Sequence, residues 1–188
     1  PDGMVLLEAL ETSTTTMTTV IEDFIDTAAL QTGNLNLKLE EITLDPIVKS
    51  LLVQYTAHAA RKNITLQIDQ ITGCVRADMA RFQQALGNLV SNAIKYSPVN
   101  TTVKLWMEDF GAIRRICVTD QGPGIPVQEQ ERLFTQFGKL TPRPTDGESS
   151  TGLGLWIVKH LITLQEGHVG VETSPGSGST FWIEMPAA

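Results

Sequence analysis

The stretch Leu86-Gly87-Asn88-Leu89-Val90-Ser91-Asn92-Ala93-Ile94-Lys95-Tyr96-Ser97 decides the fold, because it gives one helix two different faces. We expect this helix to run from about 78 to 97. At about 100° per residue, Asn88, Asn92 and Lys95 fall within a stripe about 60° wide. A neighbouring apolar face has the spacing that packs a helix on a core; it consists of Phe82, Leu86, Leu89, Val90 and Ala93. Two amides and an ammonium suit an oxyanion and its accompanying divalent cation; a merely solvated polar face is the alternative.

Composition limits the class of protein. The chain has 188 residues, 41% of them hydrophobic, which is enough for one well-cored domain and an appendage. Its net charge of −7 argues against nucleic-acid binding. We expect no membrane contact, because the chain lacks an apolar run of about 18 residues. Cys74 and Cys117 lie in apolar stretches and favour buried free thiols in a reducing, cytoplasmic compartment; whether a longer parent protein is anchored to a membrane stays open.

Residues 4–32 have a helical pattern with apolar positions that recur every seven residues, as in a helix that pairs with others in a bundle. One series is Leu10, Met17 and Phe24, and the other is Leu7, Thr14, Ile21 and Ala28. Gly33 is a plausible C-terminal cap. We predict two units, a bundle-type helix over 1–33 and a catalytic domain over 34–188. The long helix indicates self-association as a homodimer; folding back onto the domain is the alternative.

The remaining pattern predicts an α+β fold, a two-layer α/β sandwich in which three helices cover one face of a mixed, largely antiparallel sheet. Asp45 and Pro46 indicate a helix start, with Asp45 as the capping carboxylate. Asp109-Phe110-Gly111 is interpreted as a hairpin turn. The expected strands are 35–39, 64–68, 74–77, 101–108, 113–119, 169–173 and 179–185, and the other helices are 45–62 and 152–165, with a polar loop at 138–151.

A glycine-rich turn follows the strand that ends at Asp120, in the run Asp120-Gln121-Gly122-Pro123-Gly124-Ile125-Pro126. A carboxylate at a strand end can accept a hydrogen bond from an exocyclic amine such as that of adenine. Gly122 and Gly124 would let the backbone approach a flat ring. A plain Asp-Gly turn without a ligand is an almost equally good interpretation.

A second glycine motif, Gly152-Leu153-Gly154-Leu155, lies where the polar loop becomes a helix. Free amides and the dipole at a helix N-terminus favour a phosphate. Taken alone, the motif is weak, and a glycine-rich hinge is the alternative, since neither a Rossmann fingerprint nor a Walker loop is complete.

In combination, the motifs resemble the catalytic and ATP-binding domain of sensor histidine kinases, one of the Bergerat-fold ATPases. The matching stretches are an N box at 88–97, a G1 box at 120–126, an F box at 134–137 and a G2 box at 152–155. The resemblance covers about residues 35–186. The first 32 residues are similar, less specifically, to the second helix of the dimerisation and phosphoacceptor hairpin of such kinases.

The resemblance implies roles for individual residues. Asp120 would bind the adenine amine, Asn92 would coordinate Mg²⁺ with help from Asn88, and Lys95 and Tyr96 would face phosphates and ribose. Gly152 and Gly154 would let the loop fold over the triphosphate of ATP. The other implied nucleotide contacts are Gly122, Gly124, Ile125, Lys139, Arg143, Leu153, Leu155 and Thr180. Phe134 and Phe137 are expected to anchor the loop in the core.

Asn88 and Lys95 are the implied catalytic residues. In hydrolytic relatives of the superfamily a glutamate stands at the place of Asn88, so we expect slow hydrolysis of ATP to ADP here. The γ-phosphoryl would remain for a histidine nucleophile, then for relay to an aspartate of a response regulator receiver domain.

The three histidines of this chain, His58, His160 and His168, are expected to be structural, because none stands in a phosphoacceptor context. The acceptor helix is then expected upstream of Pro1, so the chain should bind Mg-ATP without phosphorylating itself. Three alternatives stay open: a degenerate nucleotide-binding or partner-binding module, a related serine kinase, and a true ATPase.

Overall fold

The computed structural model describes residues 2–33, 35–138, 141, 144–145 and 151–188; in the first turns of the N-terminal helix it describes mainly the backbone. The elements follow one another as α1 (Asp2–Thr32), β1 (Glu40–Thr43), α2 (Leu44–Arg61), β2 (Thr65–Ile68), β3 (Cys74–Ala77), α3 (Met79–Tyr96), β4 (Thr102–Asp109), β5 (Ile113–Asp120), α4 (Val127–Gln130), α5 (Gly154–Thr163), β6 (His168–Thr173) and β7 (Ser179–Pro186).

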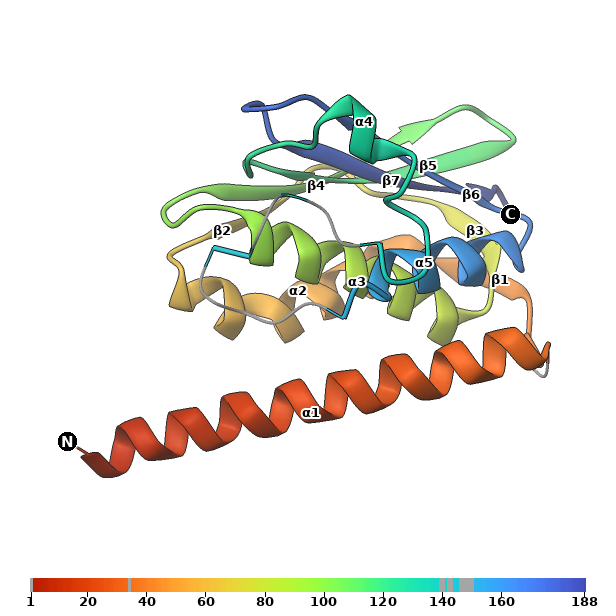
Figure 1. The fold of residues 1–188 in the computed structure, drawn as a ribbon. Coiled ribbons are helices and arrows are strands. Elements are labelled where there is room, and N and C mark those ends of the chain that lie inside the picture. Colours follow the sequence, from red (N-terminus) through yellow and green to blue (C-terminus); the bar gives the residue numbers. More distant parts are fainter. Residues whose placement is uncertain (1, 34, 139–140, 142–143, 146–150) are drawn as a thin grey trace.

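The main sheet has five strands in the order β2-β4-β5-β7-β6, and a smaller sheet pairs β1 with β3. Only β2 and β4 pair in parallel in the main sheet, and its other pairs are antiparallel. Helices α2, α3 and α5 form a layer against one face of the sheet, and α1 runs along the outside of this layer (Figure 1). The two-layer α+β architecture expected from the sequence is confirmed.

Helix α3 lies at the centre because its apolar face is buried almost completely. Phe82, Leu86 and Ile94 are inaccessible to solvent and pack in the main core beneath the sheet. Asp78 begins the helix as predicted, since its carboxylate accepts a hydrogen bond from the backbone N–H of Arg81 at 3.1 Å. Removing so many apolar side chains from water fixes the rotation of α3 about its own axis, and its polar stripe is therefore held in one direction.

Two local predictions are wrong. Residues 35–39 alternate in burial as a strand would, yet this segment is extended without pairing, and the strand β1 begins only at Glu40. Asp45 does not cap α2, because the helix begins one residue earlier, after Thr43. The Asp45 carboxylate instead pairs with Lys49 one turn further on, at 2.9 Å.

Helix α1 forms as predicted, but its second half is packed on the rest of the chain. Asp23 and Thr27 are buried, and Asp26 pairs with Arg81 of α3 at 3.1 Å. The second half of the helix therefore folds back onto the domain, which is the alternative that the sequence left open beside self-association. Met17 and Phe24, members of the predicted seven-residue series, are exposed.

The other predictions on local structure give mixed results. The Asp109-Phe110-Gly111 hairpin is confirmed, because Gly111 has a φ of +78° and donates its N–H to the Asp109 carboxylate at 2.8 Å. Both cysteines are free thiols in strands, as predicted, but only Cys117 is buried and Cys74 is partly exposed. Among the helices of the described residues, none has both the length and the apolar character that a bilayer crossing requires.

Candidate nucleotide site

The stripe on α3 lies where the sequence places it. Asn88, Asn92, Lys95 and Tyr96 are all partly exposed, while the residues between them on the neighbouring face are buried. The side chains of this stripe therefore reach solvent from a helix that cannot rotate, which is a favourable arrangement for holding a ligand in one orientation.

The glycine turn after β5 packs against the C-terminal end of α3. A Cβ on Gly122 would lie 2.8 Å from Asp120 Oδ1 and 2.9 Å from the carbonyl oxygen of Tyr96, so only glycine fits between them. Asp120 and the end of the α3 stripe are thus close neighbours, with only Gly122 between them.

Asp120 is 5% exposed, and its Oδ1 accepts the backbone N–H of Gly122 at 2.7 Å. Burial raises the pKa of this carboxyl to about 6, although hydrogen bonds from the N–H groups of Gly122 and Ser179 act in the opposite direction. A desolvated carboxylate of this kind gains from a ligand that donates a hydrogen bond, and strongly shifted pKa values are frequent at functional sites.

The rest of the turn is held by the β6–β7 hairpin. Gly124 has a φ of +68°, and a Cβ there would lie 1.9 Å from the carbonyl oxygen of Ser174. The carbonyl oxygen of Pro123 accepts the N–H of Gly176 at 2.7 Å. Ile125 donates its own N–H to Thr173 Oγ1 at 3.0 Å, and its side chain lies in the main core. Any contribution of Ile125 to a ligand would therefore come through its backbone.

The second glycine motif faces the middle of the α3 stripe. Gly154 is the first residue of α5, and a Cβ there would lie 4.0 Å from Asn92 Nδ2. Gly152 has a φ of +71° and lies beside Phe137, so that a Cβ added to this glycine would lie 3.2 Å from Phe137 Cα. The N-terminus of α5, with its unsatisfied N–H groups, is thus placed next to the amide of Asn92.

The remaining predicted residues around the second glycine motif and the polar loop lie in different surroundings. Leu153 is buried in a small cluster with Trp156, and Leu155 is half-buried against the main core. Phe134 packs against that core as expected, but Phe137 is 61% exposed with a φ of +56°, so the prediction that it anchors the loop is wrong. Lys139 and Arg143 lie outside the described residues.

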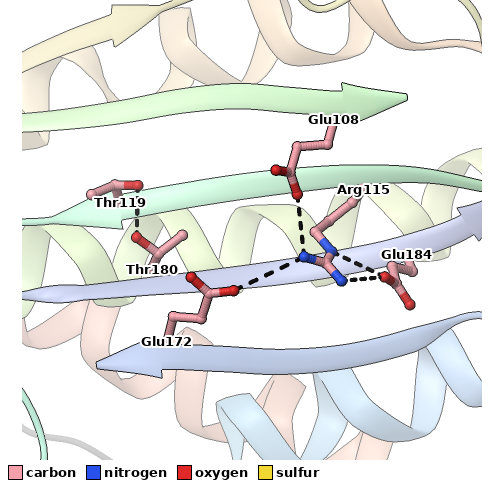
Figure 2. Close-up of polar contacts among 6 residues, drawn as sticks. All are labelled: Glu108, Arg115, Thr119, Glu172, Thr180 and Glu184. Atoms are coloured by element: carbon pink, nitrogen blue, oxygen red, sulfur yellow. Dashed lines mark hydrogen bonds and ion pairs between the residues drawn. The ribbon is translucent and has the colours of Figure 1, made fainter. Parts of the chain in front are cut away.

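Thr180 lies on the face of the sheet away from the helices. Its hydroxyl and that of Thr119 are 3.0 Å apart, on the same face as Arg115 and its ion pairs with Glu108 and Glu184 (Figure 2). Asp120 on β5 is paired not with Thr180 but with Ser179, the residue before Thr180 on β7, and Ser179 is buried. The alternation of side chains in a strand explains the difference: a shift of one residue changes the face.

Sequence reasoning also missed Lys62. This lysine is 3% exposed, and its Nζ donates to the carbonyl oxygens of Ile94 at 2.7 Å and Lys95 at 3.1 Å. It donates as well to Thr145 Oγ1 at 2.6 Å. Its ammonium therefore caps the C-terminus of α3, directly behind the polar stripe. A single lysine after a helix carries no sequence signal for such a position.

The histidines have structural surroundings where contacts are defined. His160 Nδ1 lies 2.9 Å from the carbonyl oxygen of Trp156, and its ring packs on that indole at 4.0 Å between centroids. His168 is exposed on β6, and His58 is partly exposed on α2. Within the described part of the chain, no three His, Cys, Asp or Glu side chains gather as a metal site. A divalent cation would thus depend on amides and on the phosphates of a ligand.

Comparisons with known proteins agree with this geometry. Residues 77–188 match the family model described as histidine kinase-, DNA gyrase B-, and HSP90-like ATPase. The sensor-like histidine kinase SenX3 of Mycolicibacterium smegmatis is 34% identical over 168 residues, which is 89% of this chain and 44% of SenX3. The chain thus spans less than half the length of this curated relative.

Two solved structures have the same fold. The full-length structure of ShkA in complex with AMPPNP aligns with a TM-score of 0.81 and 28% identity, covering 100% of this chain and 39% of that one. The histidine kinase ThkA in complex with the response regulator protein TrrA aligns with a TM-score of 0.71 and 25% identity, covering 92% and 49%.

Proposed function

Because the chain belongs to the histidine kinase-, DNA gyrase B-, and HSP90-like ATPase family, we propose that it is the ATP-binding catalytic domain of a sensor protein-histidine kinase. The observation that carries this proposal is that the turn after β5 and the start of α5 both lie against α3. The buried carboxylate of Asp120 abuts the end of α3, and the first residue of α5 faces Asn92 on the same helix.

In this proposal the adenine amine donates a hydrogen bond to Asp120, which replaces part of the solvation that burial removes from the carboxylate. Gly122 and Gly124 let the turn pack closely against Tyr96 and Ser174, which would hold its backbone in one position beside a flat ring. The AMPPNP bound to ShkA, which has the same fold, supports an adenine nucleotide as the ligand.

The triphosphate would extend from Asp120 along the α3 stripe. Asn92, with Asn88 beside it, would offer amide oxygens to Mg²⁺, which commonly keeps waters and uses substrate phosphates as its other ligands. The N–H groups at the start of α5, after Gly152, and the ammonium of Lys95 would offset the charge of the β- and γ-phosphates. The bound Mg²⁺ would supply charge neutralisation at these phosphates.

The transfer itself requires a nucleophile that this chain is not expected to supply. A neutral imidazole nitrogen attacks the γ-phosphorus, a P–N bond forms, and the bond from the γ-phosphorus to the bridging oxygen of ADP breaks. Positioning and charge neutralisation provide most of the catalysis in such a reaction. Asn88 cannot act as a general base towards water, and this favours transfer to a histidine over hydrolysis.

The partners follow from the same proposal. The phosphohistidine would pass its phosphoryl group to an aspartate of a response regulator, and the crystallised complex of ThkA with TrrA supports a partner of this class. The exposed apolar side chains of α1, such as Met17 and Phe24, support homodimerisation through this helix. A domain that uses ATP needs the cytoplasmic nucleotide pool, so we place it in the cytoplasm.

Calorimetric titration with ATP, with and without Mg²⁺, tests the binding step. We expect binding that Mg²⁺ strengthens, and a chain without Mg-dependent affinity for ATP would refute the proposal. Incubation with γ-labelled ATP tests the transfer step. The chain alone should release little labelled phosphate and keep no label; rapid release would favour an ATPase, and stable label on the chain would contradict an external acceptor.

A further inference from the structure

Asp23 of α1 reaches the same end of α5 that we assign to the phosphates. Its side chain is 9% exposed, and its Oδ2 accepts the hydroxyl hydrogen of Thr151 at 2.7 Å. The same hydroxyl oxygen accepts the backbone N–H of Leu153 at 3.3 Å. One hydroxyl group therefore connects a carboxylate of α1 to the first residues of α5.

The negative charge of the Asp23 carboxylate is only partly stabilised by its surroundings. Burial raises the pKa of its carboxyl, and the nearby carboxylates of Asp26 and Glu22 act in the same direction. The hydrogen bond from Thr151 and the charge of Lys95 lower it. Lys95, which we assign to the phosphates, therefore already acts on a carboxylate in this structure.

The other contacts that hold α1 are polar contacts with α3 and an apolar contact with α5. Asp26 accepts from Arg81 Nη1 at 3.1 Å and from the side-chain amide of Gln84, both on the first half of α3. Leu30, near the end of α1, packs against the cluster of Leu153 and Trp156. Among the described polar contacts of α1, the Asp23 carboxylate is thus the one that meets the start of α5.

We propose that Asp23 competes with the triphosphate for the Thr151 and α5 end of the nucleotide site, so that docking of α1 and binding of Mg-ATP oppose each other. This rests on the proposed nucleotide function. A second anion placed beside a buried carboxylate is repelled by it, and the carboxylate can leave only with its helix. Because coupling between two sites is reciprocal, the nucleotide would loosen α1 by the factor by which docked α1 weakens the nucleotide.

The direct test compares the dissociation constants for Mg-ATP of the wild-type chain, Asp23→Asn and Glu22→Gln. Asp23→Asn keeps the shape and removes the charge, so it should bind about 5- to 30-fold more tightly, the lower part of the usual range for coupled sites. Glu22→Gln makes the same chemical change at an exposed position one residue earlier, and should stay within about twofold of wild type.

Equal or weaker binding by Asp23→Asn, with wild-type binding intact, would overturn the inference and leave the proposed function standing. Absence of Mg-ATP binding by the wild-type chain would refute both. Asp26→Asn provides a second variant, because it weakens the other anchor of α1 without touching the phosphate end. It should also tighten binding, by about 2- to 10-fold, and an unchanged affinity would count against competition.

A measurement on the unmodified protein does not depend on any variant folding. Hydrogen exchange of the backbone amides over 20–30 should become faster when Mg-ATP is saturating, because a helix released from the domain frays more readily. Unchanged or slower exchange in this segment, with nucleotide bound, would overturn the inference.

Discussion

Asp120 and Ser179 face each other as partners across the antiparallel pair of β5 and β7, and the Ser179 backbone N–H donates to the Asp120 carboxylate. The Ser179 hydroxyl lies 2.9 Å from Thr173 Oγ1, which also accepts the N–H of Ile125. The hairpin of β6 and β7 therefore fixes both the carboxylate and the turn that follows it. The end of the site that we assign to the base depends on this hairpin as much as on the Asp120 motif itself.

Replacing Asp120 by Asn should separate binding from stability. The variant loses a charged acceptor, and the affinity for Mg-ATP should fall about 10- to 150-fold, the equivalent of one hydrogen bond to a charged group. The unliganded variant should be more stable than wild type at pH 7.5, by up to about 3 kcal/mol, because no charge is then buried. Calorimetric titration and urea unfolding measure the two effects.

Thr180→Val is the matched control for this change, since Thr180 lies in the neighbouring position of β7 but on the opposite face of the sheet. Its affinity should stay within about twofold of wild type. A large loss of affinity in Thr180→Val would show that Thr180 contributes to nucleotide binding after all.

The raised pKa of Asp120 predicts a dependence of stability on pH with a definite sign. The folded-state pKa of about 6 lies above the ordinary value of 3.8, so the folded protein binds the extra proton between these values. The contribution of Asp120 to the free energy of unfolding is thus present below pH 4 and is lost as the pH rises through 6. It amounts to about 3 kcal/mol.

The difference in unfolding free energy between wild type and Asp120→Asn isolates this group from the other carboxylates. As the pH rises from 4 to 7, the variant should become more stable relative to wild type. A difference in unfolding free energy that does not vary with pH would contradict a raised pKa of Asp120. The affinity for Mg-ATP should fall below pH 6, as protonation removes the acceptor.

Replacing Asn92 by Ala should remove the dependence of ATP binding on Mg²⁺. The side chain faces the first residue of α5, and alanine offers no oxygen to a cation there. Affinity in the presence of Mg²⁺ should fall at least about tenfold, while affinity in its absence should change little. Asn36→Ala, in an exposed extended segment, is the control and should behave as wild type in both titrations. A Mg²⁺ effect of wild-type size in Asn92→Ala would exclude Asn92 as a metal ligand.

Two glycines with similar backbone conformation should respond differently to alanine. Gly124 and Gly176 have φ values of +68° and +82°, so both variants bear the strain of a left-handed residue, about 1–2 kcal/mol. A Cβ at Gly124 would also collide with the Ser174 carbonyl, whereas nothing lies within 4 Å of a Cβ at Gly176. We expect Gly124→Ala to lose about 2–5 kcal/mol of stability and most of its nucleotide affinity.

Gly176→Ala should keep its nucleotide affinity. Urea unfolding and nucleotide titration of both variants check the prediction, and equal losses would show that the close packing against Ser174 is unimportant.

The sequence was sufficient to predict an element where a strong apolar periodicity or a helix cap determines its position. The apolar face around Phe82 and Leu86 predicted both α3 and its burial, and Asp78 predicted where α3 begins. The glycine motifs also predicted the turn after Asp120 and the start of α5 near Gly154, whereas the close packing of Gly122 against Tyr96 was not predicted.

Tertiary packing decided what the sequence could not. The face on which Thr180 or Ser179 lies depends on the register of β7 against β5, and a single residue of shift exchanges them. Phe137 looks like a core residue by composition, yet the left-handed backbone at this position turns it outward. The roles of Lys62 and Asp23 depend on contacts with residues more than 30 positions away, for which no local pattern exists.

The smaller apolar cluster is built by Leu153, Trp156, Ile157 and Leu161 together with Leu30 and Leu35, and it is separate from the main core. Helix α1 could thus leave the domain without exposing the main core. Substitutions at Leu30 or Leu35 can then tune the stiffness of the joint alone. The main core therefore sets the stability of the fold, while the smaller cluster sets how firmly α1 stays in place.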